Sequence, residues 1–189
     1  MPEMVNGVDR EALFQTVDAV KANPELAKFE FRLDNRWVDG GLNRSNVSNF
    51  RGTCQEIDHA APFELVSDEP GVLLSGDQGP NPVESLLHAL AGCLTTSMVY
   101  HAAAEGLQVD AVRTRFEGDL DLRGFLGLDP NIRNGYQAIR VVFEIDGNLT
   151  PQQKQDLIYM ATEHSPVYDV VTHGVPVSCQ LAEDAAKTH

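Results

Sequence analysis

Apolar residues recur every three to four positions in several stretches of the chain, which is the spacing of a helix with one buried face. The first stretch predicts a helix over residues 10–22, capped by Asp9. Two later stretches predict shorter helices that begin after Thr150 and after Ser165, each followed directly by a proline that suits the first helical turn. A fourth stretch predicts a helix over residues 82–105, and because it is apolar or small on every side from Leu86 to Ala104, this helix should be buried on most faces.

Between these stretches apolar and polar residues alternate, which is typical of strands with one buried face. The alternation predicts strands within residues 29–37, 44–50, 63–67, 112–116, 139–145 and 175–181. Residues 123–134 are polar and contain glycine, and they predict a long loop. Because helices do not separate the strands regularly, the sequence favours an α+β fold over a doubly wound parallel sheet.

The chain has 189 residues, a length that fits one domain with a sizeable core. Its formal net charge of -14 argues against nucleic acids and anionic membrane surfaces as partners. No apolar span is long enough to cross a membrane, and the first ten residues do not resemble a secretory signal. Three cysteines at wide spacing do not suggest a disulfide scaffold or a metal site, and they fit a cytoplasmic location.

The start of the central helix is the most informative segment. Asn81 can cap the helix, Pro82 suits its first position, and Glu84 stands three residues after the cap, as in a capping box. Cys93 follows in the middle of the same helix. A thiol in that position is either an inert small hydrophobe or a reactive centre in a shielded pocket, and the local sequence leaves both interpretations open.

Three segments of the chain resemble the OsmC/Ohr family, which is named for osmotically inducible protein C and the organic hydroperoxide resistance proteins. They are Gly-Pro-Asn-Pro-Val-Glu at 79–84 with Ala-Leu-Ala-Gly-Cys at 89–93, Ser-Pro-Val-Tyr at 165–168, and Gly-Val-Pro-Val at 174–177. Their order and spacing fit the family over residues 29–182. Residues 1–28 are then expected to form a helical extension, and residues 183–189 a frayed tail.

The resemblance implies an α+β fold in which β-sheets wrap around the long central helix of an intertwined homodimer. It also implies a thiol-dependent peroxidase that reduces organic hydroperoxides or hydrogen peroxide in defence against oxidative stress. In family members with this activity, the helix cysteine attacks the peroxide and a second cysteine then closes a disulfide. An arginine and a glutamate activate the first thiol, and an external thiol reductant restores the enzyme. No cofactor is implied.

The family's catalytic residues carry over only in part. Cys93 matches the attacking cysteine, whereas Ser165 stands where the second cysteine belongs. A serine cannot form the disulfide, although it suits the helix cap and could hydrogen-bond the oxidised sulfur. The activating arginine is assigned to Arg44, with Arg36 and Arg51 as competitors.

The activating glutamate is also in question. In the strongest peroxidases of the family it stands ten residues before the attacking cysteine, where this chain has Val83. Glu84 is adjacent, but nine residues at about 100° each place it on the opposite side of the helix from Cys93. Glu84 is therefore expected to cap the helix rather than to polarise the thiol.

A substrate pocket is predicted along the Cys93 face of the helix from four- and seven-residue spacing. Its lining is mostly apolar with hydroxyl groups toward one end, and it comprises Leu86, Leu90, Ser97 and Tyr100. This lining suits an oily hydroperoxide, but burial would raise the pKa of the thiol unless a cation lies close. Among the other thiols, Cys179 fits a buried strand position, and Cys54 is a candidate substitute for the missing second cysteine.

Two functions stay open. In the first, the protein is a thiol-dependent peroxidase in which Cys93 becomes a sulfenic acid that a cellular thiol, or Cys54, resolves. In the second, the dimer fold persists without peroxidase chemistry and binds an apolar small molecule. The serine at 165 and the valine at 83 favour this second function.

Overall fold

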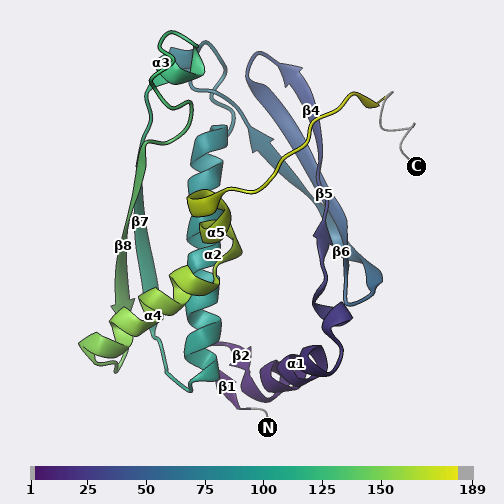
Figure 1. Ribbon diagram of the computed structural model, residues 1–189, viewed down its shortest axis with the longest axis vertical. Coiled ribbons are helices and arrows are strands. Elements are labelled where there is room, and N and C mark those ends of the chain that lie inside the picture. The colour runs from purple at the N-terminus through teal and green to yellow at the C-terminus, as the bar shows by residue number, and fades with distance from the viewer. Residues whose placement is uncertain (1–2, 183–189) are drawn as a thin grey trace.

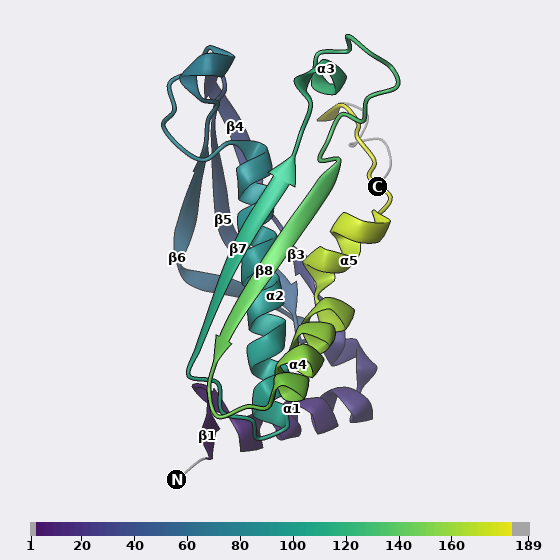
Figure 2. The same cartoon turned by 90° about the vertical axis from the view of Figure 1, so that its left-hand side faces the viewer.

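The computed structural model describes residues 3–182, and within them the fold is α+β, as predicted (Figure 1). The long helix α2 (Pro82–Ala104) stands in the middle of the molecule. On one side lies an antiparallel ribbon of β7 (Ala111–Asp119) and β8 (Ala138–Asp146), and on the other side lies a larger antiparallel sheet. Figure 2 shows the ribbon crossing in front of α2 when the molecule is turned.

The larger sheet is formed by the residues that precede α2. Its strands are β3 (Glu30–Phe31), β4 (Asp34–Asp39), β5 (Leu42–Gly52) and β6 (Gln55–Ser67). β5 pairs with the other three, and β5 and β6 form a long hairpin. The strands predicted at 44–50 and 63–67 are confirmed, and both extend further than the alternating pattern indicated.

The two faces of this sheet differ in chemistry. Paired residues of antiparallel strands lie on the same face, so the register places Trp37, Phe63 and Leu65 together on one face. Trp37 is 67% exposed and Phe63 is 57% exposed. Nearer the hairpin turn, Phe31, Phe50 and Ile57 share a face, and Phe31 is 76% exposed. The sheet therefore leaves large apolar side chains uncovered within one chain.

The aromatic rings of this sheet form a connected row. Neighbouring ring centroids lie between 5.0 and 6.2 Å apart along the row, which comprises Phe29, Phe31, Phe50, His59 and Phe63. Such separations are those of favourable aromatic pairs. The row joins the two exposed apolar regions of the sheet into one surface.

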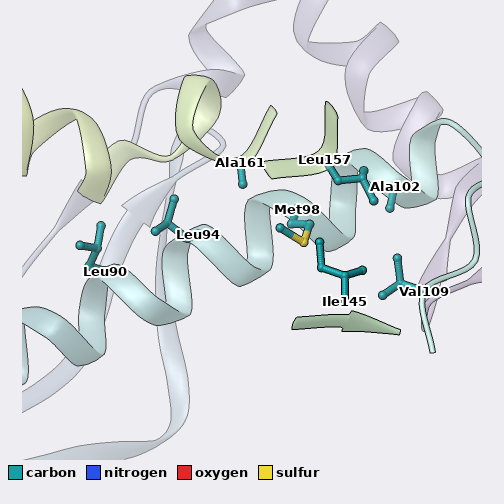
Figure 3. Packing of buried hydrophobic residues seen from close by; sticks show 8 residues of the cluster. All are labelled: Leu90, Leu94, Met98, Ala102, Val109, Ile145, Leu157 and Ala161. Atoms are coloured by element: carbon teal, nitrogen blue, oxygen red, sulfur yellow. The ribbon is translucent and has the colours of Figure 1, made fainter. Parts of the chain in front are cut away.

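The hydrophobic core lies where α2 meets the ribbon and α4 (Pro151–His164). One stripe of α2 is buried, and it comprises Leu90, Leu94, Met98 and Ala102. Figure 3 shows Leu157 and Ala161 of α4 on one side of this stripe and Ile145 of β8 on the other. Burial of such side chains contributes about 1.5–3 kcal/mol each and holds the three elements together.

The expectation that α2 is buried on most faces is not met within one chain. Leu86 is 38% exposed and Tyr100 is 50% exposed, although both lie in an apolar segment. Figure 1 shows the larger sheet standing apart from α2, with the ribbon on the other side of the helix. The remaining apolar surface of α2 needs another covering element.

The helix starts follow the sequence closely. Asn81 Oδ1 accepts the Glu84 backbone N–H at 2.8 Å, and the Glu84 carboxylate accepts the Asn81 N–H at 2.9 Å. Glu84 is thus engaged in capping α2, as expected. Thr150 begins α4 with a second capping box, and Ser165 caps α5 (Pro166–His173).

The N-terminal extension is attached to the far end of α2. The helix α1 (Arg10–Ala22) has the predicted bounds, and a hairpin of β1 (Met4–Val5) and β2 (Val8–Asp9) precedes it. Asn6 in the hairpin turn donates to the carbonyl of Leu107 at 2.9 Å and accepts the N–H of Val109 at 2.8 Å. Arg10 donates to the carbonyl of Ala104, the last residue of α2.

Two element predictions are wrong. Residues 175–181, predicted as a strand, pair with no strand among residues 3–182 and are exposed, and Cys179 is exposed with them. Alternation of apolar residues does not form a strand unless a neighbouring edge pairs with its backbone. The predicted loop at 123–134 overlaps a short helix, α3 (Leu122–Phe125), which Asp121 caps.

Short 3-10 turns occur at Pro24–Ala27 and Gly71–Leu73. The expected tail at residues 183–189 lies outside the residues that the structure describes. None of the described helices combines the length and apolar character that crossing a bilayer requires.

Candidate functional site

Cys93 lies in the middle of α2 as a free, half-buried thiol. Ser97 follows one helical turn later, and its hydroxyl donates to the carbonyl of His164 at 3.5 Å. His164 is the last residue of α4, and Ser165 directly follows it. The Cys93 side of α2 therefore meets the junction between α4 and α5 at Ser97.

Ser165 is buried at this junction. Its Oγ accepts the backbone N–H of Tyr168 at 3.1 Å and so caps α5, as the sequence predicted. A hydroxyl that accepts one hydrogen bond still has its own proton to donate. Ser165 thus supplies a donor, and not a thiol, at the position that the sequence resemblance assigns to a second cysteine.

Two histidines meet at the same junction, and the sequence did not single out their contact. The rings of His101 and His164 lie 4.5 Å apart between centroids, with a tilt of 30°. Burial lowers the pKa of His101, and the charge of His164 lowers it further. Both effects favour an uncharged His101 near neutral pH. His101 follows Cys93 by eight residues on the same helix, and this spacing was the sequence signal that could have pointed to His101 as part of the site.

Arg44, the predicted activating residue, lies on β5 and forms an ion pair with Glu64 on β6. Its cross-strand neighbour is Arg36, and both lie on the face of the sheet opposite to Trp37 and Phe63. Within residues 3–182, no hydrogen bond joins Cys93 to any arginine. One chain alone does not bring Arg44 and Cys93 into contact.

Arg51, the other competitor, lies near the hairpin turn on the face opposite to Phe31 and Phe50. Cys54 is in that turn, where it is exposed and adopts a left-handed backbone with φ of 65°. Cys54 is thus accessible to other thiols, and its role as a resolving thiol stays a prediction.

The predicted substrate pocket divides into two parts. Leu86 and Leu90 line a groove of about 440 Å³ between α2, β8 and α5. Ser97 and Tyr100 do not line it. Ser97 instead contacts the α4–α5 junction, and the side chain of Tyr100 is half exposed.

A fully buried carboxylate, Asp68, fixes the loop that leads into α2, and the sequence did not indicate it. Asp68 accepts the hydroxyl of Ser75 and the backbone N–H groups of Glu69 and Gln78. Ser75 in turn accepts the N–H of Gly41 in the turn between β4 and β5. The hydrogen bond from Ser75, followed by those from the backbone, lowers the pKa of Asp68 despite its burial.

The part of the chain that the structure describes contains no group of three or more His, Cys, Asp or Glu side chains placed to hold a metal ion. The features of the site are therefore the Cys93 thiol, the hydroxyl groups and histidines at the α4–α5 junction, and the neighbouring apolar groove.

Comparisons with known proteins place these features in a family. A family model described as OsmC-like protein matches residues 75–180, which include α2, the ribbon, α4 and α5. The structure of an OsmC-like protein from Mycoplasma pneumoniae is similar with a TM-score of 0.59 and 14% identity, over 76% of this chain and 88% of that chain. No curated protein matches the chain.

A second solved structure, an organic hydroperoxide resistance protein OsmC from Legionella pneumophila, has a TM-score of 0.51 and 16% identity, over 78% of this chain and 94% of that chain. At such identities the structural likeness shows the fold, while the family model covers more than half of the sequence. The central helix with its cysteine and the short helix after residue 165 both fall within that match, and the chain belongs to the family of OsmC-like proteins.

Proposed function

We propose that this protein acts in defence against oxidative stress by reducing hydroperoxides through Cys93. The main support is the position of Cys93, a free and half-buried thiol in the middle of the central helix of an OsmC-family chain. One structurally similar protein bears the name organic hydroperoxide resistance protein. Organic hydroperoxides and hydrogen peroxide are the proposed substrates.

The reaction begins with attack of the Cys93 thiolate on one peroxide oxygen. A sulfur–oxygen bond forms as the oxygen–oxygen bond breaks, and the leaving oxygen takes up a proton and departs as an alcohol or water. Cys93 is then a sulfenic acid, oxidised by two electrons. The hydroxyl of Ser165 can donate a hydrogen bond to this oxidised sulfur but cannot form a disulfide with it.

Regeneration in this proposal requires an external thiol. A first reductant thiol condenses with the sulfenic acid, releases water and leaves a mixed disulfide on Cys93. A second thiol attacks the mixed disulfide, so that the reductant becomes oxidised and the Cys93 thiol returns. Cys54 is the internal alternative, and it is a free, exposed thiol in the β5–β6 turn.

The active form in this proposal is a homodimer. Trp37, Phe31 and Phe63 are exposed on the larger sheet, and Tyr100 is exposed on α2. Exposed apolar surface of this extent is typical of an interface. Both outer edges of the β7–β8 ribbon also lack a pairing strand within residues 3–182. A second copy would cover the apolar side chains and offer partners to these edges.

Arg44 stays the proposed activating residue, and the sheet limits how it can act. It lies on the face opposite to Trp37 and Phe63. For Arg44 to stabilise the thiolate, a second copy must therefore bring its Cys93 to the face of the larger sheet that carries Arg36 and Arg44. Such a contact within about 4–6 Å would lower the pKa of the Cys93 thiol.

The Cys93→Ser variant should lose peroxidase activity, because a serine hydroxyl does not replace a thiolate as the attacking nucleophile. With cumene hydroperoxide and excess dithiothreitol, we expect its rate to fall at least about 100-fold, to the rate without enzyme. Intact-mass analysis of the wild-type protein after one equivalent of peroxide should show oxidation at Cys93. Cys179→Ser, which removes an exposed thiol that has no role in the proposal, should keep the wild-type rate. An unmodified Cys93, together with equal rates for Cys93→Ser and the wild type, would disprove the proposal.

A second candidate function is the binding of an apolar small molecule without peroxidase chemistry. The groove lined by Leu86 and Leu90, and the lack of an arginine bonded to Cys93 in the described chain, favour it. Native mass spectrometry of the protein purified from its natural source should then show a retained ligand. Protein that is uniformly empty in that measurement would count against this function.

A further inference from the structure

We infer that the groove between α2, β8 and α5 binds an alkyl chain with a carboxylate head group, and that Arg133 holds the carboxylate. Leu86 and Leu90 of α2 line the groove, whereas Cys93 does not. The inference gives the ligand-binding candidate a defined site and ligand class. It does not depend on whether Cys93 reacts with peroxides.

The floor of the groove is apolar. Its volume of about 440 Å³ falls in the range of small-molecule sites, roughly 300–1,000 Å³. The apolar lining comprises Leu86, Leu90, Ile139, Val141, Val170 and Val171. These side chains come from three separate elements, and an alkyl chain lying among them would be removed from water on most of its sides.

The wall that carries Arg133 is fixed in place. The Tyr136 hydroxyl donates to the carbonyl of Val83 in the first turn of α2 at 2.9 Å. Two glycines permit close packing of this wall: a Cβ at Gly118 would lie 2.4 Å from the Tyr136 ring, and a Cβ at Gly124 would lie 2.5 Å from the carbonyl oxygen of Arg133. A fixed wall reduces the entropy that binding must overcome.

The charge of Arg133 is available to a ligand. Seven other arginines form ion pairs with carboxylates, and they are Arg10, Arg32, Arg44, Arg113, Arg115, Arg123 and Arg140. Arg133 has no such partner among residues 3–182, although the chain carries a net charge of -14. A guanidinium group binds a carboxylate through two parallel hydrogen bonds.

The neighbouring charges place the head group at Arg133 rather than elsewhere. Burial raises the pKa of Tyr136, and the negative charge of Glu84 raises it further. Tyr136 therefore stays uncharged and does not repel an anion held at Arg133. On α5, Asp169 is bonded to His173. Arg133 is the cationic side chain in the lining of the groove, which Tyr168 also lines.

The test titrates dodecanoate, and separately dodecanol, into the full-length reduced protein by isothermal calorimetry. We expect the wild type to bind dodecanoate, and Arg133→Gln to weaken that binding about tenfold or more through loss of the charged hydrogen bonds. Arg133→Gln should leave dodecanol binding unchanged. Val170→Trp, which fills the groove, should abolish binding of both ligands.

Two further variants serve as matched controls. Arg36→Gln removes an arginine that also forms no ion pair within the described residues but lies outside the groove, and it should bind dodecanoate as the wild type does. Cys93→Ser should also bind normally, so failure of the peroxidase proposal would not affect this result. Equal dodecanoate affinity in Arg133→Gln and wild type would overturn the inference. So would the absence of binding to the wild type, as expected if a second copy fills the groove.

Discussion

Replacing Phe63 with aspartate should convert the proposed dimer into a monomer. Phe63 is 57% exposed on the larger sheet, on the same face as Trp37 and Leu65 and in ring contact with His59. In a symmetric dimer the change acts twice, and each copy loses the burial of an aromatic ring and gains a desolvated charge. We expect the dissociation constant to rise by at least roughly 100-fold, as measured by sedimentation equilibrium.

Two variants control for changes in folding and in charge. Phe63→Leu keeps an apolar side chain and should leave the dimer intact. Gln155→Asp places a carboxylate on an exposed position of α4, away from the larger sheet, and should also leave it intact. Unchanged dimerisation of Phe63→Asp, with a normal circular dichroism spectrum, would show that this face is not the interface.

The second large effect is expected at Asp68. Asp68→Asn replaces a fully buried acceptor with a group that presents donors toward the N–H of Gln78 or the hydroxyl of Ser75. We expect the melting temperature to fall by roughly 5–15 °C, because at least one charge-assisted hydrogen bond is lost and one donor faces another. Ser75→Ala, which removes one donor, should have a smaller effect. Asp34→Asn, the same change at an exposed position of β4, should shift the melting temperature little.

The effect of Asp68→Asn should also depend on pH in a defined direction. The hydrogen bonds from Ser75 and the backbone hold the pKa of Asp68 below its usual range in the folded chain. The unfolded chain therefore binds the proton more readily, and the carboxylate stabilises the fold fully above the usual pKa of aspartate. The difference in stability between wild type and variant should be constant from neutral pH to about 5 and shrink in more acidic solution. A difference that grew with acidity would contradict this assignment.

Local features of this protein were predictable from sequence, and features that depend on distant partners were not. The starts of α2, α4 and α5 follow from a cap residue and a proline that are adjacent in sequence, so Asn81, Thr150 and Ser165 were assigned correctly. The alternation of Val175 and Val177 predicted a strand, but no neighbouring edge meets it within the described chain. Pattern alone does not supply that edge.

In the candidate site, too, the local features were predictable from sequence and the long-range contacts were not. The sequence placed Cys93 in the middle of the central helix, and the structure confirms that position. It also separated Glu84 from the thiol by helical geometry, and the capping box accounts for that carboxylate. It did not indicate the contact of His101 with His164 or the burial of Asp68, because both depend on loops and helices that meet only in three dimensions.

The hydrogen bonds from Asn6 and Arg10 to the end of α2 and the loop after it affect how a shortened version of this protein would behave. The family match begins at residue 75, so Asn6 and Arg10 lie outside it. Yet these two side chains satisfy backbone groups of Ala104, Leu107 and Val109, which would otherwise face solvent or stay unsatisfied. Trimming the protein to its recognisable homologous region would therefore uncap the end of the helix in which Cys93 lies.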